Sequence, residues 1–159
     1  MRRCSIAAIA AGVLAACSGP PAPPQQPVPF SHKVHAGDNR IGCLMCHVYA
    51  ERSPVAGVPS MARCAGCHRF VGQDKPAVQQ VMQASTEGKP IEWLQIYRLP
   101  DHVFFTHERH LAVGLVCTSC HGEVAAMEVM TQVSPLTMGW CVDCHRSRQA
   151  PIDCLTCHK

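Results

Sequence analysis

Five copies of the pattern Cys-x-x-Cys-His constrain this chain more than any other feature of its 159 residues. They are motif 1 (residues 43–47), motif 2 (64–68), motif 3 (117–121), motif 4 (141–145) and motif 5 (154–158). The pattern is the attachment signal of a c-type haem. The thioether-forming residues would be Cys43, Cys46, Cys64, Cys67, Cys117, Cys120, Cys141, Cys144, Cys154 and Cys157. The histidine after each pair is placed to bind the iron as its proximal ligand.

Zinc knuckles and disulfide bonds are the two alternatives, since both also use paired cysteines. Neither requires a histidine directly after every second cysteine. We therefore predict five covalently bound c-type haems, whose proximal iron ligands are His47, His68, His121, His145 and His158.

The other five histidines equal the haems in number, so we predict that they are distal ligands of five bis-histidine irons. They are His32, His35, His102, His107 and His110. The alternative is a methionine ligand or an open position at one iron, for which the available residues are Met45, Met61, Met127, Met130 and Met138. A six-coordinate iron leaves no place for a small-molecule substrate. We therefore expect an electron carrier without catalytic residues, and not an enzyme.

An internal repeat organises the motifs. The element Phe-x-His-x-x-His occurs at residues 30–35 and again at 105–110, an offset of 75, and two haem motifs follow each copy. This predicts two similar two-haem modules (30–68 and 105–145), with motif 5 appended after Pro151. Histidines three residues apart lie on one side of a helical turn, so each can reach a different haem.

The inter-module segment, residues 69–104, contains no haem motif. Its pattern predicts a short amphipathic helix with Pro76 near its start and Gly88 after its end. Residues 91–97 alternate loosely and are predicted to be extended. Their apolar side chains either pack over haems and join the modules, or form an edge where a partner docks; they are Trp93, Leu94 and Ile96.

Aromatic residues make up only 5% of the chain, which is too few for an ordinary core in so small a domain. We expect porphyrin to supply most of the core of a small, mostly α-helical and irregular fold, the pentahaem domain 30–159. The formal net charge of +3 gives no indication of a nucleic-acid partner.

The N-terminus predicts export and a lipid anchor. Residues 1–16 have a basic start and an apolar stretch too short to span a bilayer. They end in Leu-Ala-Ala before Cys17, as in a bacterial lipobox, so Cys17 is the predicted lipidation site; the alternative is an ordinary signal peptide. Residues 17–29 are Pro-rich and would form an extended tether. These features place the domain on the periplasmic side, anchored to the inner or outer membrane.

The Phe-x-His-x-x-His element before a haem motif resembles multihaem cytochromes of the c3/c7 class. The resemblance implies that the first histidine serves the next haem in sequence, which would pair His32 with His47 and His107 with His121. It leaves the partners of His35, His102 and His110 open.

Residues 30–33, 88–93, 99–103 and 135–141 resemble the multihaem cytochrome c subunit of alternative complex III and of related quinone-linked complexes of the molybdopterin family. This implies membership of a membrane respiratory complex, with an iron–sulfur or molybdopterin-type subunit as the redox partner. Alternatives are a free-standing lipoprotein that carries electrons to a reductase, or a multihaem reductase.

Overall fold

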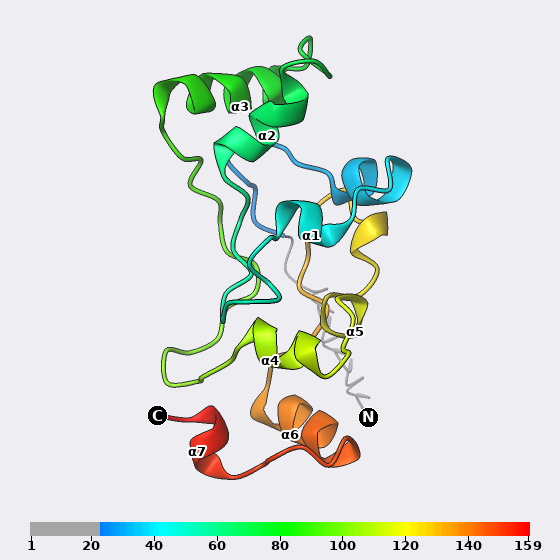
Figure 1. The fold of residues 1–159 in the computed structure, drawn as a ribbon, viewed down its shortest axis with the longest axis vertical. Coiled ribbons are helices and arrows are strands. Elements are labelled where there is room, and N and C mark those ends of the chain that lie inside the picture. Colours follow the sequence, from blue (N-terminus) through cyan, green and yellow to red (C-terminus); the bar gives the residue numbers. More distant parts are fainter. Residues whose placement is uncertain (1–22) are drawn as a thin grey trace, which may run out of the picture.

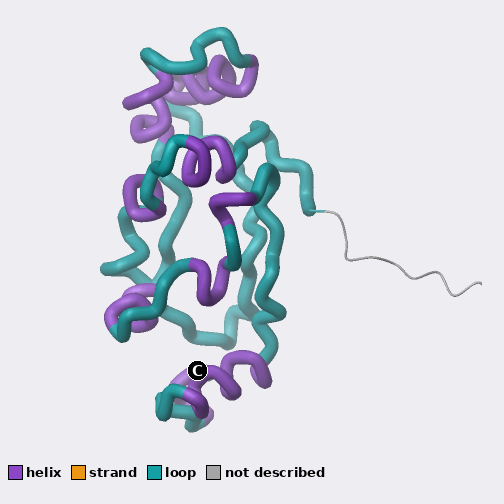
Figure 2. Tube along the Cα trace, turned by 90° about the vertical axis from the view of Figure 1, so that its right-hand side faces the viewer, coloured by secondary structure: helices purple, strands orange, loops and turns teal. Residues whose placement is uncertain are grey.

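The computed structural model describes residues 23–159. The predicted signal peptide and Cys17 lie outside these residues. Within them the chain forms short helices joined by long loops, and Figure 2 shows no strand in this part. A single antiparallel bridge between Val103 and His158 is the only pairing of β type among the described residues. The architecture agrees with the mostly helical, irregular fold expected from the sequence.

The elements follow one another in the order η1 (Lys33–Asp38), α1 (Cys43–Cys46), α2 (Met61–His68), α3 (Pro76–Glu87), α4 (His107–Ala112), α5 (Thr118–His121), η2 (Val124–Ala126), α6 (Met138–Ser147) and α7 (Cys154–Cys157). Of these, η1 is a π-helix and η2 a 3₁₀-helix. In Figure 1, α2 and α3 lie at one end of the long axis, and α6, α7 and the C-terminus lie at the other.

Helix α3 lies where the sequence predicts a helix, and its boundaries follow from two residues. Pro76 occupies its first turn, where the missing N–H costs nothing, and Gly88 follows its end with a φ of 66°. Val78 is the buried residue of α3, and Ala65 is the buried residue of the neighbouring α2. The haem-free segment therefore covers the helix that carries motif 2.

The segment after α3 forms no strand, but it is held on both sides. The side-chain amide of Gln26 donates to the Leu94 carbonyl and accepts from the Leu94 N–H, both at 2.9 Å. The Trp93 ring lies 6.3 Å from that of Phe30, and the Tyr97 ring lies 4.4 Å from that of His121. The segment thus contacts residues of both predicted modules.

The last residues of the Pro-rich stretch also belong to the packed structure. Val28 is buried, and Gln26 makes the two hydrogen bonds to Leu94. Residues 26–28 therefore lie against the domain, so any free tether ends before them.

Few apolar side chains of the described residues are buried by protein alone: Val28, Ala50, Ala65 and Val78. By contrast, the side chains of Phe70 and Leu155 are 79% and 83% exposed. Side-chain packing of this extent does not hold a domain together. None of the helices within residues 23–159 has the length and apolar character required to cross a membrane.

Candidate haem sites

Each of the five motifs forms a helical turn. Motifs 1, 2, 4 and 5 lie in α1, α2, α6 and α7, and motif 3 forms α5 with Cys117 as its N-cap. Residues three apart in a helical turn lie on the same side, so both thiols of a pair can reach one porphyrin. None of the ten motif cysteines forms a disulfide bond within the described residues, so all ten are available for thioether bonds.

The arrangement of these residues does not fit zinc. No group of three or more Cys, His, Asp or Glu side chains within residues 23–159 converges on a common point where a metal ion could bind. A structural zinc site needs four such ligands in a tetrahedron. The thiols are paired but the pairs do not gather into sites of this kind.

The histidines come together in pairs, each with one member from a motif and one from elsewhere. The ring centroids of His35 and His68 are 5.9 Å apart, those of His110 and His145 6.1 Å. Those of His107 and His121 are 6.4 Å apart, and those of His102 and His158 5.6 Å apart. Four predicted proximal ligands thus each face a different predicted distal ligand.

The spacing within these pairs is suited to an iron between the rings. A metal–nitrogen bond is about 2 Å long, and the centre of an imidazole lies about 1 Å beyond its nitrogen, so two rings on opposite sides of one metal have centroids about 6 Å apart. Aromatic pairs in direct contact also have centroids about 4.5–7 Å apart, so the assignment depends equally on the pairing of one histidine from a motif with one from elsewhere. The donor set and its spacing therefore fit bis-histidine haem.

Backbone carbonyls orient six of these rings. The Nδ1 atoms of His35 and His110 lie 2.8 Å from the carbonyl oxygens of Ser31 and Thr106. His47, His68, His107 and His145 make the same kind of contact, to Gly57, Val71, Pro54 and Pro151. A carbonyl only accepts, so Nδ1 carries the proton and Nε2 keeps a lone pair for a metal.

His32 and His47 are the remaining predicted distal and proximal ligands. Burial lowers the pKa of His32, and the neighbouring His47, His35 and His121 lower it further. Burial likewise lowers the pKa of His121, with added effects of His107 and His47. A lowered pKa favours the neutral imidazole, which is the form that binds metals. The Nδ1 atom of His32 is buried without a hydrogen-bond partner in the described chain.

The two copies of the Phe-x-His-x-x-His element have matching local geometry. Phe30 lies 4.8 Å from His32 and 4.4 Å from His35, measured between ring centroids. In the second copy, the corresponding distances from Phe105 to His107 and His110 are 4.9 and 4.4 Å. The phenylalanine therefore supports both histidines in each copy.

The capping hydroxyls of the two copies also correspond. Ser31 Oγ accepts from the N–H of Val34 at 3.1 Å, and Thr106 Oγ1 accepts from that of Arg109 at 3.3 Å. Sequence reasoning did not single out these hydroxyls, although a Ser or Thr before a helical turn is the ordinary signal of an N-cap.

In each motif, at least one thiol lies near enough to a thiol of another motif for one to affect the pKa of the other. Burial raises the pKa of Cys64, and the Cys46 thiol raises it further. The pKa of Cys117 is raised by burial and then by Cys43. Burial also raises the pKa of Cys120 and of Cys141, and the next largest causes are the thiols of Cys144 and Cys157, respectively. These neighbours connect motif 2 to motif 1, motif 1 to motif 3, motif 3 to motif 4, and motif 4 to motif 5.

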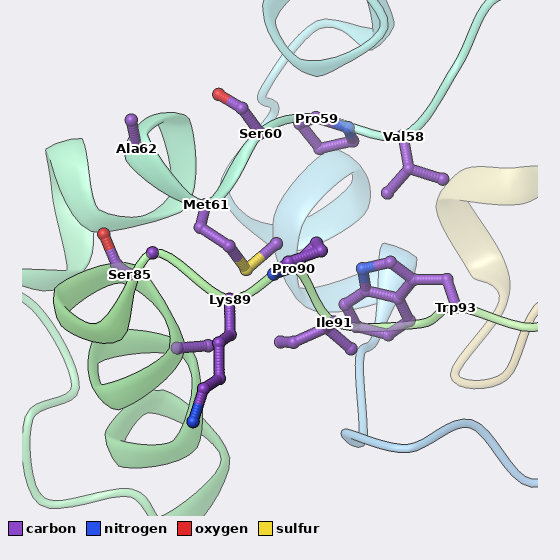
Figure 3. Close-up of a pocket in the computed structure, with 12 residues that line it drawn as sticks. Val58, Pro59, Ser60, Met61, Ala62, Ser85, Lys89, Pro90, Ile91 and Trp93 are labelled. Carbon is purple, nitrogen blue, oxygen red and sulfur yellow. The ribbon is translucent and has the colours of Figure 1, made fainter.

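A pocket of about 460 Å³ opens beside the first turn of α2 (Figure 3). Its walls are mainly apolar and include Met61, Pro90, Ile91 and Trp93. The indole Nε1 of Trp93 is buried without a partner in the described chain. The pocket lies one turn before Cys64, so Trp93 and Met61 belong to the surroundings of motif 2.

Two of the methionines considered as alternative ligands are mostly exposed: Met45 by 61% and Met138 by 69%. Met61 lines the pocket beside Trp93, and the Met127 sulfur lies 4.0 Å from the Thr131 hydroxyl. Four of the predicted proximal histidines face a predicted distal histidine instead.

Comparison with known proteins agrees with this chemistry. The family described as "Cytochrome c7 and related cytochrome c" matches residues 103–159. The "Menaquinone reductase, multiheme cytochrome c subunit" of Nitratidesulfovibrio vulgaris (strain Hildenborough) is 34% identical over 162 residues, which cover 85% of this chain and 77% of that protein. The similarity expected from the sequence, to c7-type cytochromes and to the cytochrome subunit of a quinone-linked complex, is confirmed. The chain therefore belongs to the multihaem cytochromes c, and it is an electron carrier that binds c-type haem covalently and is not itself catalytic.

Proposed function

We propose that this chain carries five c-type haems, one on each motif, and that every iron is held by two histidines. The ligand pairs are His32 with His47, His35 with His68, His107 with His121, His110 with His145, and His102 with His158. The single observation that carries this proposal is the ring spacing of 5.6 to 6.4 Å in four of the pairs. The first and third pairs are also those implied by the resemblance to c3/c7 cytochromes.

The internal repeat supports the remaining pair, His32 with His47. His32 corresponds to His107, and His47 corresponds to His121. Since His107 lies opposite His121, the same arrangement in the first copy puts His32 opposite His47. His47 also lowers the pKa of His32, where only burial has a larger effect, and this supports a short distance between the two rings.

A haem held in this way supplies a one-electron couple and leaves no coordination position for a substrate. The chain's own residues fix the axial ligands and orient them through their Nδ1 contacts. They also place Phe30, Tyr97 and Phe105 against the rings of predicted ligands, and Trp93 beside Phe30, where these side chains would limit the access of water to a bound haem. Axial ligands, their orientation and the exclusion of water are the means by which a protein sets the reduction potential of a haem.

We further propose that the chain works as a subunit or partner of a quinone-linked membrane complex, on the periplasmic side. The similar protein from Nitratidesulfovibrio vulgaris is named as a subunit of menaquinone reductase. The N-terminal sequence supports export and lipidation at Cys17.

Haem number is tested by intact mass together with a pyridine haemochrome assay on the protein purified from a host that attaches c-type haem. We expect a mass increase of five haems and a purely c-type spectrum. A smaller increase, or a colourless protein with bound zinc, would contradict the proposal.

Ligation is tested by His107→Ala, with Met138→Leu as the control. The first change should convert one haem in five from low-spin to high-spin in the ferric state, seen by electron paramagnetic resonance. The control should leave all five low-spin. If Met138→Leu changed the spin state and His107→Ala did not, methionine ligation would be correct for that haem.

Membership of a complex is tested by purification from the native membrane through a tag on the C-terminus. An iron–sulfur or molybdopterin-type subunit should copurify in a fixed ratio, and a Cys17→Ser variant should lose its lipid while keeping its haems. Recovery of the haem protein alone would favour the free-standing electron carrier.

A further inference from the structure

The order of the motifs in space differs from their order in the sequence. Figure 1 shows α2, α1 and α5 in succession along the long axis from the end capped by α3, and α6 and α7 beside each other at the opposite end. These helices carry or form motifs 2, 1, 3, 4 and 5. The first two motifs are therefore reversed relative to the chain.

Contacts to backbone carbonyls join neighbouring motifs at both ends of this order. The Arg63 guanidinium in α2 donates to the Met45 carbonyl in α1 at 2.9 Å, which joins motif 2 to motif 1. His145 of motif 4 contacts the carbonyl of Pro151, just before motif 5. The neighbouring thiols of successive motifs follow the same order.

The junction between the modules is formed by an exchange of corresponding segments. The Lys33 N–H donates to the Met127 carbonyl at 2.9 Å, and the Glu108 N–H donates to the Ser53 carbonyl at 3.3 Å. Lys33 and Glu108 occupy the same position of the Phe-x-His-x-x-His element, and Ser53 and Met127 both lie ten residues after the first cysteine of their motif. Each module's histidine element therefore binds the loop of the other module.

Such reciprocal contact is the signature of a two-fold relation, in which position i of one unit meets position j of the other and j meets i. The residues nearest the axis must then be corresponding ones. Cys43 and Cys117 are corresponding residues, and they are the neighbouring thiols at the junction. An internal two-fold thus puts motifs 1 and 3 at the centre and motifs 2 and 4 outside them.

We propose that the five haem sites form one row in the order 2–1–3–4–5, built on this internal two-fold, with motif 2 and motif 5 as its ends. The proposal rests on the proposed five-haem function and adds the order of the sites. Haems held at these sites would supply one-electron couples that exchange electrons between neighbours, so the redox partner protein that donates and the one that accepts would contact opposite ends of the molecule. The exposed Phe70 and Leu155 mark those two ends.

The unmodified holoprotein provides the first test. In the fully reduced, diamagnetic state, nuclear Overhauser effects between haem substituents report which haems are adjacent. We expect contacts between haems 2 and 1, 1 and 3, 3 and 4, and 4 and 5. A contact between haems 2 and 3, or none between 1 and 3, would overturn the order. If intact mass showed fewer than five haems, the proposed function would fail instead, so the two failures are distinguishable.

A second test uses distal-ligand variants. His35→Met and His32→Met each raise the potential of one haem, since methionine ligation does so, and reduction of that haem then changes the midpoints of its neighbours. In the proposed row, His35→Met alters haem 2 and therefore shifts the midpoint of haem 1 alone. His32→Met alters haem 1 and therefore shifts the midpoints of haems 2 and 3. The haem methyl signals during a redox titration report these shifts. In a row that followed the sequence, His35→Met would perturb haems 1 and 3, and His32→Met haem 2 alone.

Discussion

At the residue scale, Gly37 shows how close the two modules approach. A methyl group at this position would lie 3.4 Å from the Ala125 carbonyl carbon and closer still to its oxygen. Both are backbone atoms of η2, which cannot move aside as a flexible side chain does. Gly37 is therefore needed for its lack of a side chain, and its backbone φ is an ordinary one.

We expect Gly37→Ala to lower stability by roughly 1–3 kcal/mol, the usual cost of overpacking. Thermal denaturation of the holoprotein would measure it as a fall in the midpoint. Gly139→Ala is the matched control, because an added Cβ there meets nothing within 4 Å. Equal midpoints for the two variants would show that η1 and η2 do not pack as described.

The candidate haem-site residues are named from the sequence alone, whereas most of the contacts between them are seen only in the structure. Covalent chemistry fixes the spacing of Cys43, Cys46 and His47 within one helical turn, so local sequence reveals it. The partner of His35 is His68 and that of His102 is His158, and these meet only when the chain folds back on itself. The separation of these histidines in the sequence does not indicate which of them meet in the folded chain.

At the scale of elements, one carboxylate joins η1 to the loop after η2. Glu128 accepts from the Ser31 hydroxyl at 2.7 Å and from Lys33 Nζ at 3.0 Å. The hydrogen bond from Ser31, followed by the contact with Lys33, lowers the pKa of Glu128. Since the pKa is depressed in the folded state, the contribution is present above the ordinary pKa and is lost as pH falls through the folded value.

Glu128→Gln should therefore lower the melting midpoint at pH 7, and the difference from the wild type should shrink as pH falls below about 4. The effect should be small and should weaken with added salt, because both side chains are partly exposed. Glu123→Gln is a suitable control, since Glu123 forms no ion pair within residues 23–159. A difference that persisted unchanged at pH 3 would exclude the carboxylate as its source.

Helix α3 offers a test of how its end is specified. Gly88 adopts the left-handed conformation with φ 66°, and a Cβ there would meet no other atom within 4 Å. Gly88→Ala should cost about 1–2 kcal/mol through backbone strain alone. Gly88→Asn should cost less, since asparagine tolerates this conformation. The melting midpoints of the two variants give the comparison, and the reverse order would contradict it.

The same elements show where sequence patterns succeed and where they fail. Pro76 and Gly88 are local signals, so the limits of α3 follow from them. Residues 91–97 have no such signal, and their conformation depends on Gln26, which lies 68 residues from Leu94 in the chain. A hydrogen bond of a side chain to a distant backbone leaves no periodic trace, so this contact could not be foreseen.

At the scale of the whole molecule, the fold depends on its cofactors. Helices α1, α5 and α7 have four residues each, far fewer than an isolated helix needs to be stable in water. Only four apolar side chains of the described residues are buried by protein. Neither local structure nor packing offsets the conformational entropy lost on folding, so the haems must supply the remaining buried surface.

The chain without haem should consequently be unfolded. Residues 23–159 expressed in a compartment that does not attach haem should give the far-ultraviolet circular dichroism of a random coil and should be cleaved rapidly by protease. The same residues matured with haem serve as the control and should resist cleavage. A cooperative thermal transition in the haem-free chain would mean that protein contacts alone define the fold, and the internal two-fold would then precede haem attachment. We expect haem attachment to come first and the internal two-fold to form after it. The reason is that the thiols and imidazoles at the junction would pack against porphyrin in the mature protein.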